Sequence, residues 1–238
     1  MPDTERKDQR PIVLLDVDDT LLDFHKAEAI ALSKTLRAMG VEPTEATVRR
    51  YSQINDSQWK LLEEGVLDRE TVLTRRFELL FAELGVERSG PEARDSYEKN
   101  LAVGHYFMPG AEALLEALFG KYRLFIVSNG TASVQEGRIK SAGIAKYFEQ
   151  IFISEELGAD KPSREFFRRC FEKIEGFAPD RAIIVGDRLS SDIQGGINAG
   201  IKTCWFNFAG LPARADIPAD CEIRKLSELP ELLETLFP

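Results

Sequence analysis

Short runs of bulky, largely β-branched residues recur along the chain, and most end abruptly in polar residues. The five runs cover residues 12–15, 124–127, 151–153, 182–185 and 203–206. Uninterrupted apolar runs of this length are typical of strands buried on both faces of a parallel sheet. Helical patterns separate most of the runs, and Gly200, before the fifth run, is a typical helix end. The alternation predicts an α/β fold with an open, doubly wound parallel sheet.

One long stretch, residues 22–105, breaks this alternation because it shows only helical patterns. Apolar residues recur at helical spacing in residues 27–39, 45–64, 69–84 and 91–103. We therefore predict a flexible tail at residues 1–10, a core formed by residues 11–21 and 106–238, and an inserted all-helical cap at residues 22–105. Since the insertion leaves directly after the first strand, we expect it to lie above the carboxyl edge of the sheet, over an active site.

Composition and charge narrow the class of partner. The 31 Lys and Arg residues against 40 Asp and Glu residues give a net charge of −9, which disfavours nucleic-acid polymers and anionic membranes. No apolar run approaches the roughly 18 residues of a membrane helix, and no signal peptide is visible, so we expect a cytoplasmic protein. Cys170, Cys204 and Cys221 fit no metal-ligand spacing and are interpreted as reduced structural thiols. A small molecule is the expected partner.

Carboxylates follow two of the predicted strands. Asp16 and Asp18 end the first strand, where a period of two points both side chains the same way. Such a crowded pair needs a neutralising cation, a retained proton, or both. Asp187 and Asp192 follow another strand, and carboxylate oxygens without nearby His or Cys favour Mg²⁺ over zinc. Taken alone, an Asp-x-Asp sequence also fits a surface turn.

Two further segments offer groups that bind anions. Ser128 and Asn129, with Gly130 behind them, end the second run with a hydroxyl, an amide and an accessible backbone. Lys161 precedes Pro162, which favours an extended backbone and lets the ammonium reach across the strand ends. Taken alone, these segments also fit a helix-capping turn and a solvated surface lysine. Because ligands of such sheets bind at the carboxyl ends of the strands, we expect one site from all of these segments.

The order and spacing of these segments resemble the four signature motifs of the haloacid dehalogenase superfamily. The segments are residues 16–20, Ser128-Asn129, Lys161-Pro162 and residues 186–192. The resemblance covers nearly the whole chain from Pro11 onward, including a helical cap between the first two motifs. It implies a Rossmann-like core and a bound Mg²⁺. It implies these roles: Asp16 as nucleophile, Asp18 as general acid/base, Ser128, Asn129 and Lys161 as phosphate clamp, and Asp16, Asp18, Asp187 and Asp192 as the metal group.

Asp18 bears on the type of reaction. The dehalogenases of the superfamily lack an aspartate at this position, since a halide leaves without a proton. A departing alkoxide needs one, and a protonated Asp18 could supply it. The resemblance therefore implies phosphate-ester hydrolysis through an aspartyl phosphate, rather than 2-haloacid dehalogenation.

Further segments resemble the house-cleaning pyrimidine 5′-nucleotidases of bacteria. These segments are residues 16–24, residues 55–59 with Glu64-Gly65 and Arg76-Phe77, residues 153–158 and residues 191–196. The resemblance implies a nucleoside monophosphate substrate, and we single out as substrate contacts Asp23, Phe24, Asn55, Trp59 and Arg76. Trp59 could stack on a base, worth about 1–3 kcal/mol, although a Trp at helical spacing also fits a packed core. Arg188 departs from the pattern, where a small hydroxyl residue is common.

Two other functions stay open at this point. A broad phosphatase for sugar phosphates or phosphoglycolate would use the same core under a differently lined cap. A non-enzymatic phosphoacceptor receiver also places aspartates, a hydroxyl and a lysine at strand ends, but it lacks a helical insertion and is much shorter. Steady turnover of p-nitrophenyl phosphate with Mg²⁺ distinguishes an enzyme from a receiver. The sequence is silent on oligomeric state.

Overall fold

A single parallel sheet organises the chain. The computed structural model describes residues 9–238, so most of the predicted tail at residues 1–10 lies outside the described residues. The sheet has the strand order β3-β2-β1-β4-β5-β6. The strands are β1 (Ile12–Leu15), β2 (Arg123–Ser128), β3 (Gln150–Ile153), β4 (Ala182–Gly186), β5 (Lys202–Phe206) and β6 (Cys221–Ile223). The predicted α/β fold with a doubly wound parallel sheet is confirmed.

The strand order reverses at β1. The chain fills one side of β1 with β2 and β3 and then the other side with β4, β5 and β6. Ligands of open α/β sheets bind outside the carboxyl ends of the strands at such a reversal. The sheet thus has its binding edge where β1 lies between β2 and β4.

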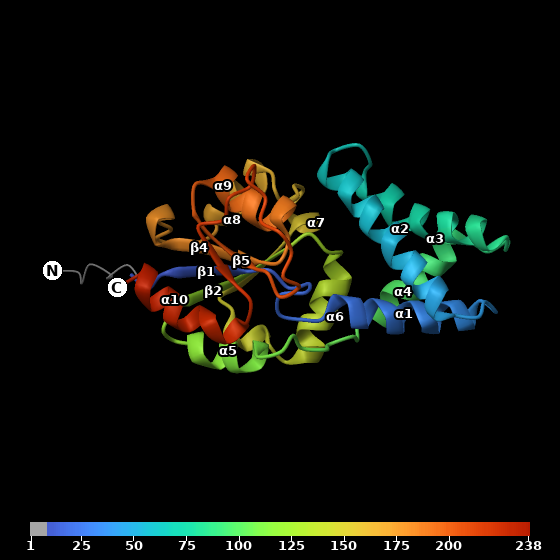
Figure 1. Cartoon of the computed structure of the whole chain (residues 1–238), viewed down its shortest axis with the longest axis horizontal. Helices are drawn as coiled ribbons and strands as arrows, with labels where there is room; N and C mark the ends of the chain where they lie inside the picture. Colours follow the sequence, from blue (N-terminus) through green and yellow to red (C-terminus); the bar gives the residue numbers. More distant parts are fainter. Residues whose placement is uncertain (1–8) are drawn as a thin grey trace. The chain divides into compact units, whose positions relative to one another are not determined.

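Apolar packing on both faces fixes these strands. The residues of β1, β2 and β4 are buried throughout. On one face, Phe125 and Phe152 from the sheet pack in one cluster with Phe166 and Phe167 of α8. Burial of each large apolar side chain contributes about 1.5–3 kcal/mol, so the packing determines where each strand ends and the polar residues begin. Figure 1 shows α8 and α9 on one face of the sheet and α5 and α10 on the other.

Contacts divide the chain into two compact units. The core unit contains the described residues up to Leu22, residues 107–132 and residues 143–238. The helical unit contains residues 23–106 and 133–142. The second segment holds most of α6, which the sequence-based division placed in the core. That the insertion forms a separate cap domain stays a prediction.

The helices are distributed between these units. In the helical unit they are α1 (Phe24–Ala38), α2 (Glu45–Glu63), α3 (Arg69–Leu84), α4 (Gly90–Leu101) and α6 (Ala132–Ala142). In the core unit they are α5 (Ala111–Leu118), α7 (Ser154–Leu157), α8 (Arg164–Phe171), α9 (Gln194–Ala199) and α10 (Leu229–Leu236). Short helical turns η1 to η4 cover Ala145–Tyr147, Pro179–Arg181, Leu189–Ile193 and Leu226–Glu228. Helix α9 ends at Gly200 in the left-handed conformation, as predicted.

Local signals and an aromatic core define the helical unit. The side chains of Thr44, Asp68 and Ser89 accept hydrogen bonds from backbone N–H groups in the first turns of α2, α3 and α4. Such caps satisfy donors that a helix leaves unpaired. Inside the unit, the Phe77 ring lies 5.1 Å from that of Tyr51 and 5.5 Å from that of Tyr97, measured between ring centroids.

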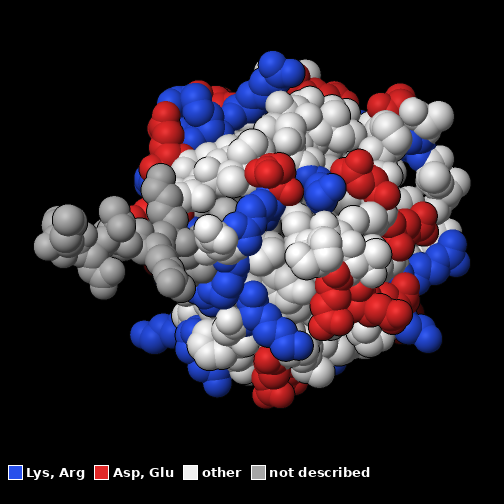
Figure 2. Space-filling model, turned by 90° about the vertical axis from the view of Figure 1, so that its left-hand side faces the viewer, with Lys and Arg blue, Asp and Glu red and all other residues white. Residues whose placement is uncertain are grey.

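The charges on the surface and the free state of the cysteines agree with what the composition indicates. Figure 2 shows a band of basic side chains running among acidic and neutral ones on one face. Within residues 9–238, no helix combines the length and the apolar character needed to cross a bilayer. All three cysteines lie in this part of the chain and are free, with Cys170 and Cys204 buried.

Candidate active site

Asp16 stands directly after β1, at the binding edge of the sheet. Its backbone N–H donates to the carbonyl oxygen of Val185 on β4 at 3.0 Å, so the sheet fixes its position. The chain then turns sharply: the N–H of Leu22 donates to the carbonyl oxygen of Val17 at 2.8 Å. Within this turn Asp19 has a φ of 56°, in the left-handed region that Asp tolerates better than most residues. The turn holds Asp18 beside the strand end.

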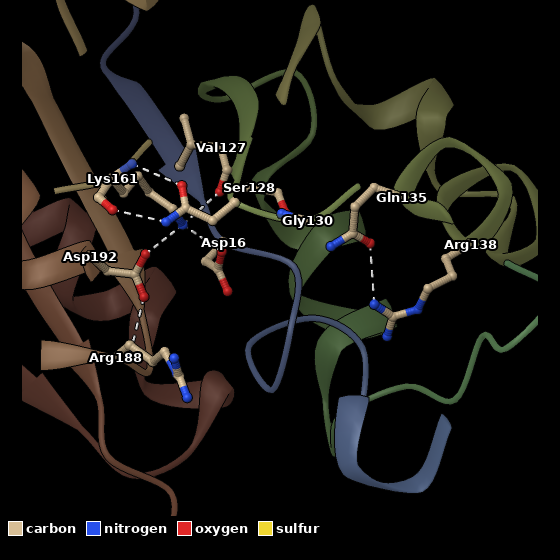
Figure 3. A network of polar contacts seen from close by, with 10 residues as sticks. Asp16, Val127, Ser128, Gly130, Gln135, Arg138, Lys161, Arg188 and Asp192 are labelled. Atoms are coloured by element: carbon tan, nitrogen blue, oxygen red, sulfur yellow. Dashed lines mark hydrogen bonds and ion pairs between the residues drawn. The ribbon is translucent and has the colours of Figure 1, made fainter. Parts of the chain in front are cut away.

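Lys161 forms the centre of the site. Its Nζ donates to Asp16 Oδ1 at 2.6 Å, to Asp192 Oδ1 at 2.6 Å and to the Val127 carbonyl oxygen at 2.9 Å (Figure 3). Three acceptors satisfy the three protons of the ammonium group. The side chain is only 2% exposed. Lys161 therefore links the ends of β1 and β2 to Asp192 in η3.

Asn129 and Ser128 shape the segment after β2. The Asn129 side chain makes two hydrogen bonds to the Lys161 backbone. Its Nδ2 donates to the Lys161 carbonyl oxygen and its Oδ1 accepts from the Lys161 N–H, both at 2.8 Å. Ser128 is buried, and its Oγ accepts from the Gly130 N–H at 3.1 Å. Of the predicted clamp residues, Asn129 and Lys161 are thus bonded to each other, and Ser128 directly precedes Asn129 in the chain.

The segment after β4 carries Asp187 and Asp192, which we call the acidic wall of the site. The backbone N–H of Arg188 donates to Asp192 Oδ2 at 3.1 Å, and Trp205 Nε1 donates to the Asp187 carbonyl oxygen at 2.8 Å. Gly186 makes the approach of Asp192 possible, because a Cβ there would lie 2.3 Å from Asp192 Cγ. No other residue type would leave the carboxylate in place.

Three carboxylates converge at this wall. Asp16, Asp187 and Asp192 each offer an oxygen atom, and these atoms lie within 4.8 Å of one another. Among the described residues Asp18 is not part of this group, so its predicted place among the metal residues stays a prediction. An all-oxygen donor set of this size fits a hard divalent cation such as Mg²⁺, with water completing the shell.

The pKa shifts of the site residues also support a bound divalent cation. Burial, together with the charges of Asp192 and Asp18, raises the pKa of Asp16 to about 7, although Lys161 opposes the shift. Burial and the charges of Asp192 and Asp16 also raise the pKa of Asp187. Burial alone would lower the pKa of Lys161, but Asp16 and Asp192 outweigh it and raise that pKa. One ammonium does not balance these carboxylates, and a bound dication would favour their ionised forms.

The five predicted substrate contacts all lie in the helical unit, where each takes part in local structure. Asn55 and Arg76 are each 3% exposed. Arg76 Nη1 donates to Asn55 Oδ1 at 2.9 Å, and Asn55 Nδ2 donates to Glu28 Oε1 at 2.8 Å. We call this set the Arg76 network. It joins α1, α2 and α3.

The other three predicted contacts also have local partners. Asp23 caps α1, its Oδ1 accepting from the Lys26 N–H at 2.8 Å. The Phe24 ring centroid lies 5.7 Å from the guanidinium carbon of Arg138. The guanidinium carbon of Arg69 lies 5.5 Å from the ring centroid of Trp59, which is partly buried. A substrate role for these five residues stays a prediction.

Glu28 and Arg138 are buried charged residues that the sequence-based reasoning did not single out. Glu28 lies on the face of α1 that also carries Ala31 and Leu32, at spacings of three and four residues. Arg138 follows Val134 by four residues on α6. In both cases a charge on an apolar helical face was the available signal.

Similarity to known proteins is consistent along nearly the whole chain. Residues 13–206 match the haloacid dehalogenase-like hydrolase family. The HAD-hydrolase YfnB of Bacillus subtilis is 38% identical, with 93% of this chain and 94% of that protein covered. The pyrimidine 5′-nucleotidase PynA of Streptococcus pneumoniae is 35% identical, with the same coverage of both chains. The pyrimidine 5′-nucleotidase YjjG of Escherichia coli is 30% identical, covering 93% and 96%.

The fold agrees as well. A crystal structure of YfnB bound to magnesium, which reveals interdomain movement in that protein, matches with a TM-score of 0.90. The match covers 94% of this chain and 98% of that one.

Proposed function

Since this chain belongs to the haloacid dehalogenase-like hydrolase family, we propose that it hydrolyses phosphate monoesters with Mg²⁺, and that its substrates are nucleoside 5′-monophosphates. Membership in a hydrolase family makes it an enzyme and excludes the receiver interpretation. The observation that carries the proposal is the convergence of Asp16, Asp187 and Asp192 beside a buried Lys161. The two pyrimidine 5′-nucleotidases among its relatives support the substrate class.

The first half-reaction uses Asp16 and Asp18. Asp16 attacks phosphorus through one carboxylate oxygen, and the bond between phosphorus and the ester oxygen breaks. Lys161 holds Oδ1 of Asp16 and so fixes the orientation of the carboxylate. Asp18 gives its proton to the departing alkoxide, which leaves as the nucleoside. The phosphoryl group is then bonded to Asp16.

The second half-reaction reverses these roles. Asp18, now ionised, takes a proton from a water molecule that attacks phosphorus. The bond between phosphorus and the Asp16 oxygen breaks, and inorganic phosphate leaves with Asp16 ionised again. Asp18 ends the cycle protonated, as it began.

The phosphoryl oxygens need positive charge and donors throughout. Lys161 supplies positive charge, the Ser128 hydroxyl supplies a donor, and Asn129 keeps Lys161 in place. Asp16, Asp187 and Asp192 would hold Mg²⁺. When bound, Mg²⁺ supplies the charge that allows an ionised Asp16 to approach a phosphate dianion.

The test is a substrate panel with metal control. Turnover of p-nitrophenyl phosphate, uridine, cytidine and adenosine 5′-monophosphates, glucose 6-phosphate and phosphoglycolate is measured with Mg²⁺ and with excess EDTA. We expect EDTA to lower every rate by at least about 10²-fold, with recovery on adding Mg²⁺. We expect the highest kcat/KM for the pyrimidine nucleotides. Full activity in EDTA would contradict the role of the metal. Equal kcat/KM for all esters would contradict the nucleotidase assignment and favour a broad phosphatase.

A further inference from the structure

Helix α6 follows β2 in the chain but packs as a member of the helical unit. Residues 133–142 group with residues 23–106, whereas Ser128 at the end of β2 belongs to the core unit. Val134 of α6 lies in the buried cluster that contains Ala27, Tyr97 and Leu101. Only residues 129–131 therefore separate the Ser128 hydroxyl from a helix that is part of the other unit.

Arg138 ties α6 to the helical unit from inside. Its side chain is 0% exposed, and its Nε donates to the Gly104 carbonyl oxygen at 3.1 Å. Its Nη1 donates to Gln135 Oε1, one turn back on α6, at 3.2 Å (Figure 3). The guanidinium also lies over the Phe24 ring of α1. A buried charge is costly unless its hydrogen bonds are made, so Arg138 resists any separation of α6 from Gly104.

The contacts on either side of Arg138 along the helix act in the same direction. At Gly137 a Cβ would lie 2.8 Å from the Ala102 carbonyl oxygen and 2.9 Å from the Ala102 Cβ, so the close approach needs a glycine. One turn further on, Ser141 Oγ and His105 Nδ1 are hydrogen-bonded at 2.6 Å. The face that holds α6 thus extends over about two turns, from Val134 to Ser141.

The beginning of α6 has a different partner. The Ala132 N–H donates to Oε2 of Glu155 on α7 at 2.6 Å, and both residues belong to the core unit. Helix α6 is thus fixed at its first residue to the core unit and along its length to the helical unit. Between β2 and Ala132 lies Asn129, whose side chain makes two hydrogen bonds to the Lys161 backbone.

We propose that Arg138 is a positioning residue for the hydrolytic reaction. Its hydrogen bonds fix α6, and residues 129–131 join α6 directly to β2. Arg138 thereby helps to hold Ser128, Asn129 and Gly130 in the position in which they bind the phosphoryl oxygens. Arg138 acts through this segment and touches no reacting atom. The inference rests on the proposed function, because it assigns the segment to phosphoryl binding.

A double-mutant cycle tests the proposal. The kcat for p-nitrophenyl phosphate is measured for the wild type, Arg138→Met, Ser128→Ala and the double variant. We expect Arg138→Met to lower kcat at least fivefold with a smaller change in KM. If Arg138 acts through Ser128, the loss in the double variant is at least threefold smaller than the product of the two single losses. A loss closer to the product overturns the proposal.

A matched control separates positioning from plain stability. Leu80→Ala removes a fully buried α3 side chain from the same apolar cluster and changes none of the residues that hydrogen-bond to α6. It is expected to lower the melting temperature, and its effect on kcat multiplies with that of Ser128→Ala. Coupling to Ser128→Ala as strong as that of Arg138→Met would mean that any damage to the helical unit has this effect, which also overturns the proposal.

Two further measurements keep the test decisive. If Arg138→Met does not fold, the milder Ser141→Ala takes its place in the cycle, judged by the same threefold criterion. Amide hydrogen exchange at residues 129–132 needs no activity, and we expect it to be faster in the Arg138 or Ser141 variant and unchanged in Leu80→Ala. A wild type that turns over no ester defeats the proposed function and leaves exchange to decide. Turnover with unchanged exchange or uncoupled effects defeats only the role of Arg138.

Discussion

Each unit of the molecule buries a basic side chain among polar partners, and the two sites differ in charge balance. In the core unit, Lys161 contacts Asp16 and Asp192, with Asp187 close by. In the helical unit, Arg76 bonds to Asn55, which bonds to Glu28. Lys161, Arg76 and Glu28 are all at most 3% exposed.

The difference lies in what each site still requires. The Arg76 network pairs one cation with one carboxylate through a neutral amide, and the rings of Phe77 and Tyr97 cover the guanidinium at 5.2 and 4.9 Å from its carbon. Each of its three side chains has a hydrogen-bonding partner inside the helical unit. The Lys161 site holds more carboxylates than one ammonium neutralises, so it gains stability from an added cation. Burial alone therefore does not identify a functional charge, whereas burial with an unbalanced charge does.

Asp16→Asn is expected to have the largest effect. The amide has nearly the size of the carboxylate but is a poor nucleophile, so turnover should fall by about 10³-fold or more while the melting temperature changes little. Steady-state kinetics and a thermal melt measure the two. The matched isosteric change in the Arg76 network, Glu28→Gln, should keep activity within about fivefold. A rate for Asp16→Asn above about one hundredth of the wild type would contradict the assignment of the nucleophile.

Removing the cation from each network comes next in size. Without metal, Lys161→Met and Arg76→Met should each lower the free energy of unfolding by about 3–5 kcal/mol, because carboxylates remain buried without their partner. Added Mg²⁺ should recover part of the loss only in Lys161→Met, since only that site has converging carboxylates. Urea unfolding with and without Mg²⁺ measures this. The same response to Mg²⁺ in both variants would contradict the difference in charge balance between the Lys161 site and the Arg76 network.

Trp59→Ala should have a smaller and selective effect. If Trp59 stacks on a base, kcat/KM for a nucleotide falls by an amount equivalent to about 1–3 kcal/mol, and that for p-nitrophenyl phosphate changes little. The contact with Arg69 shows that one face of the ring already has a partner. Kinetics on both substrates beside a thermal melt check the expectation. A lowered melting temperature with equal losses on both substrates would return Trp59 to a packing role.

The smallest effect concerns Glu28 and pH. Burial raises the pKa of Glu28 above its ordinary 4.5, although bonds to Ser52 and Asn55 and the charges of His25 and Arg76 oppose the shift. The folded protein holds this proton more tightly than the unfolded chain. Its contribution to stability is therefore complete below pH 4.5 and is lost as the pH rises through the folded-state pKa.

Glu28→Gln should accordingly match the wild type to within about 1 kcal/mol at low pH and become the more stable of the two as the pH rises. Urea unfolding of both proteins between pH 4.5 and pH 8 measures the difference. A stability difference that does not change with pH would show that burial does not control the protonation of Glu28.

Much of the core could be predicted because its signals are local. Five apolar runs became strands, and the polar residues after them meet because parallel strands end at one edge. Strand β6 was missed, since it is only three residues long and includes the exposed Glu222. The predicted helical stretches at residues 45–64 and 69–84 match α2 and α3 to within one residue, and Thr44 and Asp68 cap these helices in the structure.

The rest depended on contacts between distant segments. The Arg76 network joins three helices, and nothing in the spacing of Asn55 and Arg76 indicates that they bond to each other and to Glu28. For the same reason α6 was expected in the core: its place depends on Gly137 meeting Ala102, far earlier in the chain. Sequence patterns predict which residues are buried, but the partner of a buried polar group is fixed only by tertiary packing.

The distribution of tryptophan gives the protein a built-in optical signal. The chain has two tryptophans, Trp59 in the helical unit and Trp205 in the core unit. The indole N–H of Trp205 bonds to the backbone of Asp187, so we expect its fluorescence to change when a cation binds beside Asp187. Replacing either tryptophan by phenylalanine leaves a single emitter in the other unit. The two variants together would follow the melting of each unit separately, and the one that keeps Trp205 would follow cation uptake without an added dye.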